Sequence, residues 1–185
     1  MYKQCVTEHA ARRQREIEQA LLQVMTTIRY EDITISDLCK SIGIPRKAFY
    51  RYFSGKDGAL YALIDHTILD FSNSLPHDNF ATFETLQHYF NFWYDQKPLL
   101  NALDRNDLGG ILVNRAITLV RTDNMLPGVV PSSADQSLDY FITFFVSGLI
   151  SMILQWHNCH FRETPKQMAL IAADLLTRPA FEKRT

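Results

Sequence analysis

Basic and aromatic side chains that could bind a nucleic acid gather between residues 45 and 56. Arg46 and Lys47 follow a proline, and Tyr50 and Arg51 come one helical turn later. An arginine guanidinium can donate two parallel hydrogen bonds to guanine in the major groove, while lysine and tyrosine side chains bind phosphate oxygens. This stretch is therefore a candidate contact surface for double-stranded DNA.

The distribution of charge favours the same end of the chain. The net charge is −1 over 185 residues. Residues 1–57 nevertheless carry ten Lys and Arg against seven Asp and Glu, whereas residues 58–185 carry nine against thirteen. A basic end on an acidic chain is expected where only that end meets a polyanion. Ordinary scatter of a few charges would give similar numbers, so the asymmetry supports the local motif without establishing it.

Two short helices joined by a tight turn would present these side chains. Apolar residues between positions 35 and 42 recur at the spacing of one helical face, and Thr34 precedes them as a possible N-cap. Gly43 suits the left-handed residue that follows a helix, and Pro45 suits the first position of the next helix. The economical interpretation is a helix-turn-helix whose second helix begins with Arg46.

From Thr34 to Leu60 the chain reads TISDLCKSIGIPRKAFYRYFSGKDGAL. This segment resembles the DNA-binding domain of TetR-type (TetR/AcrR) transcriptional regulators in the turn residue Gly43, the pair Tyr50 and Phe53, and the Lys-Asp that begins the next helix. The resemblance implies a recognition helix that enters the major groove, with Arg46 nearest the base edges. The DNA contacts that we expect are Thr34, Pro45, Arg46, Lys47, Tyr50, Arg51 and Lys56, with Tyr50 and Lys56 on phosphates.

The segment departs from the usual TetR pattern at three positions. Pro45 replaces a small hydroxyl residue, Lys47 replaces a common glycine, and Ala48 replaces a threonine that would bind a phosphate. These departures change the expected phosphate contacts rather than the motif.

Apolar periodicity predicts helices along the rest of the chain. They are expected over residues 8–29, 59–71, 80–94, 98–103, 111–120 and 140–161, and from Pro165 onward. Gly109-Gly110 is expected to break the chain, and residues 124–133 to form a loop. We predict an all-α protein with a three-helix DNA-binding domain over residues 1–57 and a helical ligand-binding and dimerisation domain over residues 58–185.

Residues 140–161 contain no Asp, Glu, Lys or Arg, and this 22-residue window is long enough to span a bilayer, which needs about 20 apolar residues. Polar residues within the window argue against a span. The flanking charges do so too, because acidic residues precede the window and Arg162 and Lys166 follow it, which would place the C-terminus rather than the DNA-binding end in the cytoplasm. We predict no membrane association and a helix buried against its own domain and a second subunit. The predicted homodimer interface comprises Leu149, Ile153, Met168, Ile171 and Leu175.

The aromatic residues between 89 and 94 exceed what one helix face needs. Core packing explains Phe90 and Trp93 with no further purpose, whereas the resemblance to ligand-responsive repressors suggests a cavity for a small apolar or amphipathic effector. The expected ligand-binding residues are His66, Tyr89, Phe90, Trp93, Arg115 and Phe145. The segments FNFWYDQKPLL, FFVSGLISMILQWH and TPKQMA are more weakly similar to a TetR subgroup resembling the activator of dihydroxyacetone kinase genes.

The sequence contains no recognisable catalytic constellation, phosphate-binding glycine loop or HExxH motif, so we expect no enzyme activity, catalytic residue or cofactor. His157, Cys159 and His160 suggest zinc, but no nearby Cys or His cluster supplies the remaining ligands, so no metal is expected. Three scattered cysteines and an N-terminus unlike a signal peptide favour the cytoplasm.

Two functions remain open at this level. The first is a homodimeric regulator, of the repressor type, that binds a palindromic operator and is released by a small molecule. The second is an α-helical interaction or scaffold protein that keeps the fold without binding an operator. The salt dependence of DNA binding would distinguish them.

Overall fold

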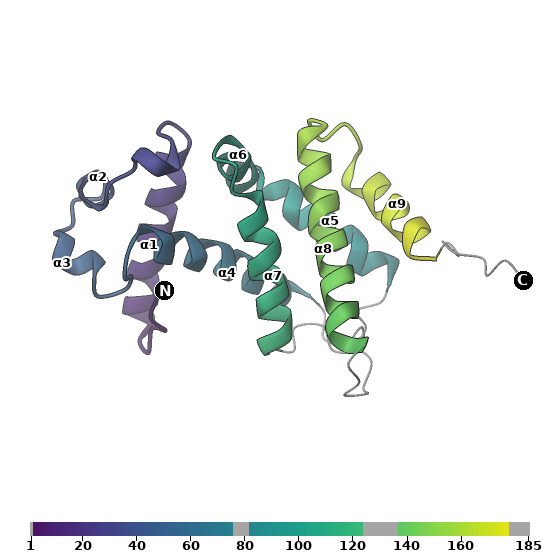
Figure 1. The fold of residues 1–185 in the computed structure, drawn as a ribbon, viewed down its shortest axis with the longest axis horizontal. Coiled ribbons are helices and arrows are strands. Elements are labelled where there is room, and N and C mark those ends of the chain that lie inside the picture. Colours follow the sequence, from purple (N-terminus) through teal and green to yellow (C-terminus); the bar gives the residue numbers. More distant parts are fainter. Residues whose placement is uncertain (1, 76–81, 124–136, 178–185) are drawn as a thin grey trace, which may run out of the picture.

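A small helical head lies at one end of an elongated helical body (Figure 1). The computed structural model describes residues 2–75, 82–123 and 137–177. The head contains α1 (Glu8–Met25), the single 3-10 turn η1 (Tyr30–Asp32), α2 (Ile35–Ser41) and α3 (Arg46–Phe49). The body contains α5 (Phe83–Asp95), α6 (Lys97–Arg105), α7 (Gly109–Asp123), α8 (Ser137–Asn158) and α9 (Pro165–Thr177), and α4 (Lys56–Ser74) runs from head to body. Within these ranges there is no β-strand, which confirms the all-α prediction.

Threonine side chains begin three of these helices. Thr7, Thr34 and Thr82 each accept a hydrogen bond from the backbone N–H three residues later, which satisfies one of the free donors at the start of α1, α2 and α5. The predicted N-cap at Thr34 is therefore confirmed.

Two helix boundaries differ from the predictions. The first helix ends at Met25 rather than Arg29, and the carbonyl groups of Thr26 and Thr27 beyond it accept hydrogen bonds from Arg105. Gly109-Gly110 begins α7 instead of breaking the chain. The break falls at Asp107, which has φ 56° and lets the next backbone N–H bond to the carbonyl of Leu103. The predicted loop at residues 124–133 lies outside the described residues.

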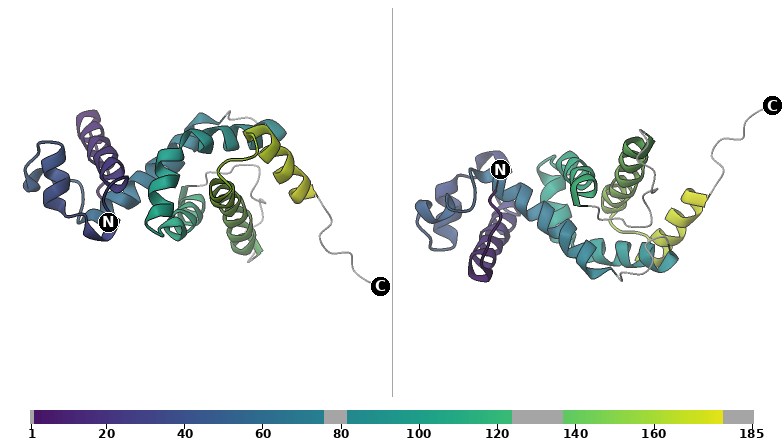
Figure 2. Two further views of the ribbon diagram at one scale, coloured as in Figure 1. Left: turned by 90° about the horizontal axis from the view of Figure 1, so that it is seen from above. Right: turned by 90° about the horizontal axis from the view of Figure 1, so that it is seen from below.

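The hydrophobic core is continuous from head to body along α4. In the head, α1 packs against α2 and α4. In the body, α4 packs against α7, α7 against α8, and α5 against α9 (Figure 2). Phe49 and Phe53 are fully buried at the head end of this core, and Trp93 and Trp156 are buried in the body. The core therefore fixes both the DNA-binding motif and the space enclosed by the body helices.

Candidate DNA-binding surface and effector cavity

The turn between α2 and α3 has the geometry that the sequence predicts. Gly43 has φ 65°, in the left-handed region, and a Cβ at this position would be strained. The backbone N–H of Ile44 donates to the carbonyl of Cys39 at 2.9 Å, which closes the end of α2. Pro45 stands at the N-cap of α3 rather than at its first residue. The short connection fixes the direction in which α3 leaves α2.

Two buried rings anchor α3. Phe49 and Phe53 are 0% and 1% exposed, with ring centroids 5.3 Å apart. With these rings facing inward, Arg46, Lys47 and Arg51 are exposed, and no acidic partner is assigned to any of them within the described parts of the chain. Tyr50 and Thr34 are exposed too, and the Tyr50 hydroxyl lies 3.4 Å from a guanidinium nitrogen of Arg46. Unpaired cations on a fixed helix are suited to a polyanion.

Lys56 has a different environment from the other predicted DNA contacts. Its ammonium donates to the carbonyl oxygens of Tyr30 at 2.6 Å, Glu31 at 2.8 Å and Ile33 at 3.0 Å. It also lies 4.8 Å from the centre of the Tyr30 ring. An ammonium has three N–H donors, and all three are used within the protein. The prediction that Lys56 binds a phosphate is not supported by this geometry, in which Lys56 holds η1 against the start of α4.

A buried polar cluster lies where the head meets the body. Asp65 of α4 is fully buried, and its carboxylate accepts two hydrogen bonds from Arg115 of α7 and one from the Tyr2 hydroxyl at 2.8 Å. Burial, reinforced by Asp65, raises the pKa of Tyr2 well above its usual value, so its hydroxyl remains a donor. The polar residue in the apolar run LYALIDHTIL was a usable signal for Asp65, but its partners are distant in sequence.

A second buried carboxylate lies beside this cluster. Glu18 of α1 is fully buried, and both of its oxygens lie 2.9 Å from Nδ1 of His66. Burial raises the pKa of Glu18, although the bond to His66 opposes that shift. His66 and Arg115 are thus partners of buried carboxylates and do not line the apolar cavity, which corrects their assignment as ligand-binding residues.

Residues at the end of α6 form hydrogen bonds with the backbone of the segment that follows α1. The guanidinium of Arg105 donates to the carbonyl oxygens of Thr26 and Thr27. The side-chain oxygen of Asn106 accepts the backbone N–H of Tyr30 at 2.6 Å. Nothing in the sequence pattern signals these contacts, because they satisfy backbone groups about 76 residues away. They connect the body directly to the first turn of the DNA-binding motif.

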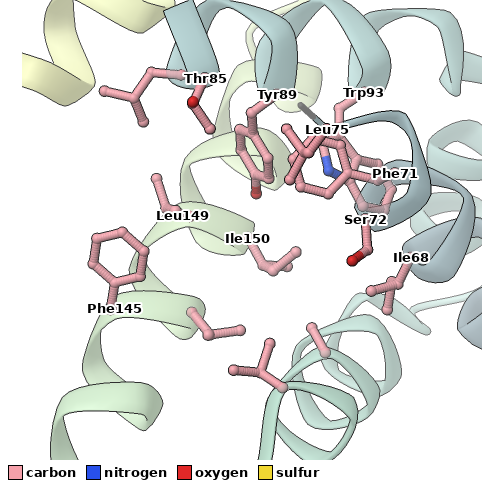
Figure 3. Close-up of a pocket in the computed structure, with 14 residues that line it drawn as sticks. Ile68, Phe71, Ser72, Leu75, Thr85, Tyr89, Trp93, Phe145, Leu149 and Ile150 are labelled. Carbon is pink, nitrogen blue, oxygen red and sulfur yellow. The ribbon is translucent and has the colours of Figure 1, made fainter. Parts of the chain in front are cut away.

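An apolar cavity of about 90 Å³ lies between α4, α5, α7 and α8 (Figure 3). Of the six predicted ligand-binding residues, Tyr89, Trp93 and Phe145 line it. Phe90 does not, because it points to the other side of α5 and packs edge-on against Trp156 at 5.8 Å. The lining residues that the sequence did not indicate are Ile68, Phe71, Ser72, Leu75, Thr85, Leu86, Ala116, Val120, Val146, Leu149 and Ile150.

The exposed apolar faces of α8 and α9 differ in part from the predicted dimer interface. Ile153 and Met168 are buried inside the protomer, so these two are not free surface residues, and the partly exposed Leu149 lines the cavity. Ile171 and Leu175 are 42% and 55% exposed, as an interface would require. The exposed large apolar residues missed on these helices are Tyr140, Phe144, Leu170 and Leu176.

The histidines and cysteine after α8 form no metal centre in the described part of the chain. Nε2 of His157 lies 2.7 Å from the side-chain oxygen of Asn101, and the His157 ring packs edge-on against Phe161. Cys159 and His160 are exposed. His157 thus connects the end of α8 to α6, and the three residues are not arranged as metal ligands in the described part of the chain.

Comparison with known proteins places this fold in a family. A family described as a TetR transcriptional regulator C-terminal region matches residues 81–178, more than half of the chain. The chain therefore belongs to the TetR family of transcriptional regulators, a family of regulators rather than enzymes. The comparisons do not extend to the dihydroxyacetone kinase activator subgroup. No curated protein sequence matches the chain.

Two solved structures share the fold. The TetR family repressor AlkX from Dietzia sp. strain DQ12-45-1b, implicated in biodegradation of n-alkanes, has a TM-score of 0.50 and 17% identity, over 88% of this chain and 92% of AlkX. The fatty acid degradation regulator FadR from Bacillus halodurans has a TM-score of 0.56 and 18% identity, over 92% of this chain and 97% of FadR. By length and composition α8 could cross a membrane, but a single such helix is weak evidence of a membrane span.

Proposed function

We propose that this chain is a homodimeric, cytoplasmic repressor that binds a palindromic operator through α3 and is released when a small molecule occupies the body cavity. The observation that carries the proposal is the set of exposed cations on α3, which have no acidic partner among the described residues and are held in place by the buried Phe49 and Phe53. Residues 1–57 are the proposed DNA-binding domain, and residues 58–185 the ligand-binding and dimerisation domain.

The DNA contacts proposed for residues of the head follow from where each residue lies on α2 and α3. Arg46 and Lys47 lie at the start of α3, the end of a recognition helix that meets base edges. Tyr50 and Arg51 follow on the exposed side and suit phosphate contacts. Thr34 and Pro45 are the N-cap residues of α2 and α3, and both are exposed.

The proposed dimer forms through the exposed faces of α8 and α9. A protomer would otherwise expose large apolar side chains on both helices, including Tyr140 at 78% and Phe144 at 79%. Contiguous apolar patches of this kind mark interaction sites in soluble proteins. A two-fold dimer would present two copies of α3, which can occupy successive major grooves about 34–36 Å apart on one face of DNA.

Release would be transmitted through α7. Ala116 and Val120 line the cavity, and the adjacent Arg115 binds Asp65, which also holds Tyr2. The arm that carries Tyr2 pairs with the chain at Phe53, in the connection between α3 and α4. A ligand that moves α7 would therefore alter the support of α3, and a shift of several Å would cost contacts in both half-sites.

The experiment is a salt titration of DNA binding by fluorescence anisotropy, with duplexes covering the region around the protein's own gene. Each phosphate neutralised adds about 0.9 to the negative slope of log affinity against log salt. We expect a clearly negative slope, and loss of the bound form in the double variant Arg46→Ala/Lys47→Ala. Binding that is absent, or insensitive to salt, would instead favour a scaffold protein of the same fold.

Membership of the subgroup that resembles the activator of dihydroxyacetone kinase genes is part of this proposal, and it rests on the segments FNFWYDQKPLL, FFVSGLISMILQWH and TPKQMA. The apolar lining of the cavity favours an apolar effector, in keeping with the implication of AlkX in n-alkane biodegradation and of FadR in fatty acid degradation. These roles belong to proteins under 20% identical to this chain.

A further inference from the structure

Two hydrogen-bond donors in the cavity have no partner. The hydroxyl of Tyr89 and the indole N–H of Trp93 are buried, and neither is hydrogen-bonded to any of the described residues. Both belong to residues that line the cavity, and Figure 3 shows the Tyr89 hydroxyl directed into it from α5. Buried polar groups are nearly always paired in folded proteins, and leaving one unpaired destabilises the fold. Two unpaired donors in one cavity therefore point to a ligand that supplies the acceptor.

The two donors project from the same helix. Tyr89 and Trp93 are four residues apart on α5, so their side chains lie on the same face of the helix. Their ring centroids are 6.4 Å apart, and the rings are inclined at 63°. A single oxygen has two lone pairs and can accept from two donors.

Among the described residues the lining carries no charge. It includes no Lys, Arg, His, Asp or Glu from residues 2–75, 82–123 and 137–177, and its other polar side chains there are those of Ser72 and Thr85. The nearby guanidinium of Arg115 is already bound to Asp65. A carboxylate in the cavity would be buried without a counter-charge, which is strongly unfavourable. Burial raises the pKa of Tyr89 well above its usual value, so its phenol remains a neutral donor.

The size of the cavity limits the ligand further. Its volume of about 90 Å³ is below that of the engineered apolar cavity of about 150 Å³ that binds benzene. A ligand with one ring would fill the space after small movements of the lining side chains. Phe145 and Leu149 are partly exposed and lie on α8 (Figure 3).

We propose that the cavity selects a small, uncharged, apolar molecule that carries one hydrogen-bond acceptor, such as a ketone, aldehyde or ester oxygen, which Tyr89 and Trp93 bind together. This inference rests on the effector function proposed above and specifies the chemical class of the effector. It distinguishes an acceptor-bearing neutral molecule from both a plain hydrocarbon and a carboxylate of similar size.

The test is calorimetric titration of the full-length protein with three matched probes: acetophenone, ethylbenzene and benzoate. Acetophenone carries the acceptor oxygen, ethylbenzene lacks it, and benzoate is charged. We expect acetophenone to bind roughly tenfold more tightly than ethylbenzene, the ratio that hydrogen bonding to buried donors typically gives, and benzoate to bind most weakly.

Two variants assign the preference to the donors. Tyr89→Phe and Trp93→Phe each remove one donor, and each should reduce the acetophenone preference severalfold while ethylbenzene still binds. Tyr94→Phe is the matched control, because Tyr94 is on the same helix but packs against Trp156 and Phe161 outside the cavity. Urea unfolding should show that Tyr89→Phe is as stable as the wild type or more stable, since it removes an unpaired buried hydroxyl.

Equal binding of acetophenone and ethylbenzene, or tightest binding of benzoate, would overturn this inference and leave the apolar effector cavity in place. An acetophenone preference that persists in both donor variants would overturn it as well. If no probe binds at millimolar concentration while the salt-dependent DNA binding is intact, the ligand class is wrong but the DNA-binding function stands.

Discussion

Arg115 on α7 and Asp65 on α4 form a bidentate ion pair at the junction of head and body. Through this pair the helix that lines the cavity is connected to the N-terminal arm. Asp65 is fully buried, and the side chain of Arg115 is 26% exposed. Asp65 also accepts the Tyr2 hydroxyl, so removing Arg115 would leave a buried carboxylate with one neutral donor.

Arg115→Ala is expected to destabilise the protein by about 3 kcal/mol, because breaking a buried ion pair by removing one partner leaves an uncompensated charge. The measurement is the urea midpoint at constant m-value. Arg121→Ala is the matched control on the same helix, since Arg121 pairs with Asp139 where both side chains are well exposed. Its cost should stay below about 1 kcal/mol. Equal costs for the two variants would contradict a structural role for the Asp65 cluster.

Glu18 should make stability dependent on pH. Its pKa is raised in the folded protein by burial, so the folded state holds this proton more tightly than the unfolded state does. The resulting stabilisation is complete below the unfolded pKa near 4.5 and is lost as pH rises through the folded pKa. Glu18→Gln removes this dependence. The stability of Glu18→Gln relative to wild type should therefore rise with pH above 4.5, by at most about 1.4 kcal/mol per pH unit.

Urea unfolding of both proteins between pH 4 and pH 8 checks this expectation. Because other groups titrate in both proteins, the informative quantity is the difference in unfolding free energy at each pH. A difference that is constant across the range would show that burial does not govern the Glu18 proton.

Lys56 and Arg51 should differ although both are basic residues next to α3. Lys56→Met removes three hydrogen bonds to backbone carbonyls, so it should lower stability by about 1.5–3 kcal/mol and leave the salt dependence of DNA binding unchanged. Arg51→Met should leave stability within about 0.5 kcal/mol and reduce the salt slope by about 0.9. Thermal unfolding and anisotropy titrations at several salt concentrations measure both effects. If Lys56→Met instead reduced the salt slope of DNA binding, Lys56 would be a DNA contact.

Asn106→Ala should loosen the turn after α1 without loosening the body. It removes the acceptor for the Tyr30 backbone N–H, a part-buried bond of 2.6 Å. Loss of about 1–2 kcal/mol of local stability corresponds to a roughly 5- to 30-fold faster amide exchange around η1. Hydrogen exchange with mass spectrometry measures it. Asn101→Ala, on the same α6 but bonded to His157 in the body, should leave η1 unchanged.

Gly148→Trp should prevent dimerisation while the protomer remains folded. Gly148 is exposed on α8, and a Cβ added there meets no atom within 4 Å in the protomer. A bulky side chain would thus hinder only a partner. Sedimentation should give twice the 21.4 kDa chain mass for wild type and a smaller mass or aggregates for Gly148→Trp. Gly110→Trp is the control, because Gly110 is equally open but lies on α7. A wild-type mass of one chain at micromolar concentration would refute the dimer.

The sequence by itself determined the features that depend on neighbouring residues. The turn at Gly43, the cap at Thr34 and the inward rings Phe49 and Phe53 follow from short-range rules, because one backbone conformation or one helix face decides them. Helix periodicity likewise gave the all-α class. The sequence grouped Phe90 with Tyr89 and Trp93 as ligand-binding residues, whereas Phe90 packs against Trp156 and does not line the cavity.

Only the tertiary structure decided which polar side chains already have a partner within the protein and which apolar side chains are buried. His66, Arg115 and Lys56 have side chains suited to binding ligands or DNA, but their partners Glu18, Asp65 and the carbonyls of η1 lie between 23 and 50 residues away. On α8 apolar residues surround the helix, so periodicity could not tell the buried Ile153 from the exposed Phe144. A charge or an apolar face remains available for function only when no distant segment of the chain has paired with it.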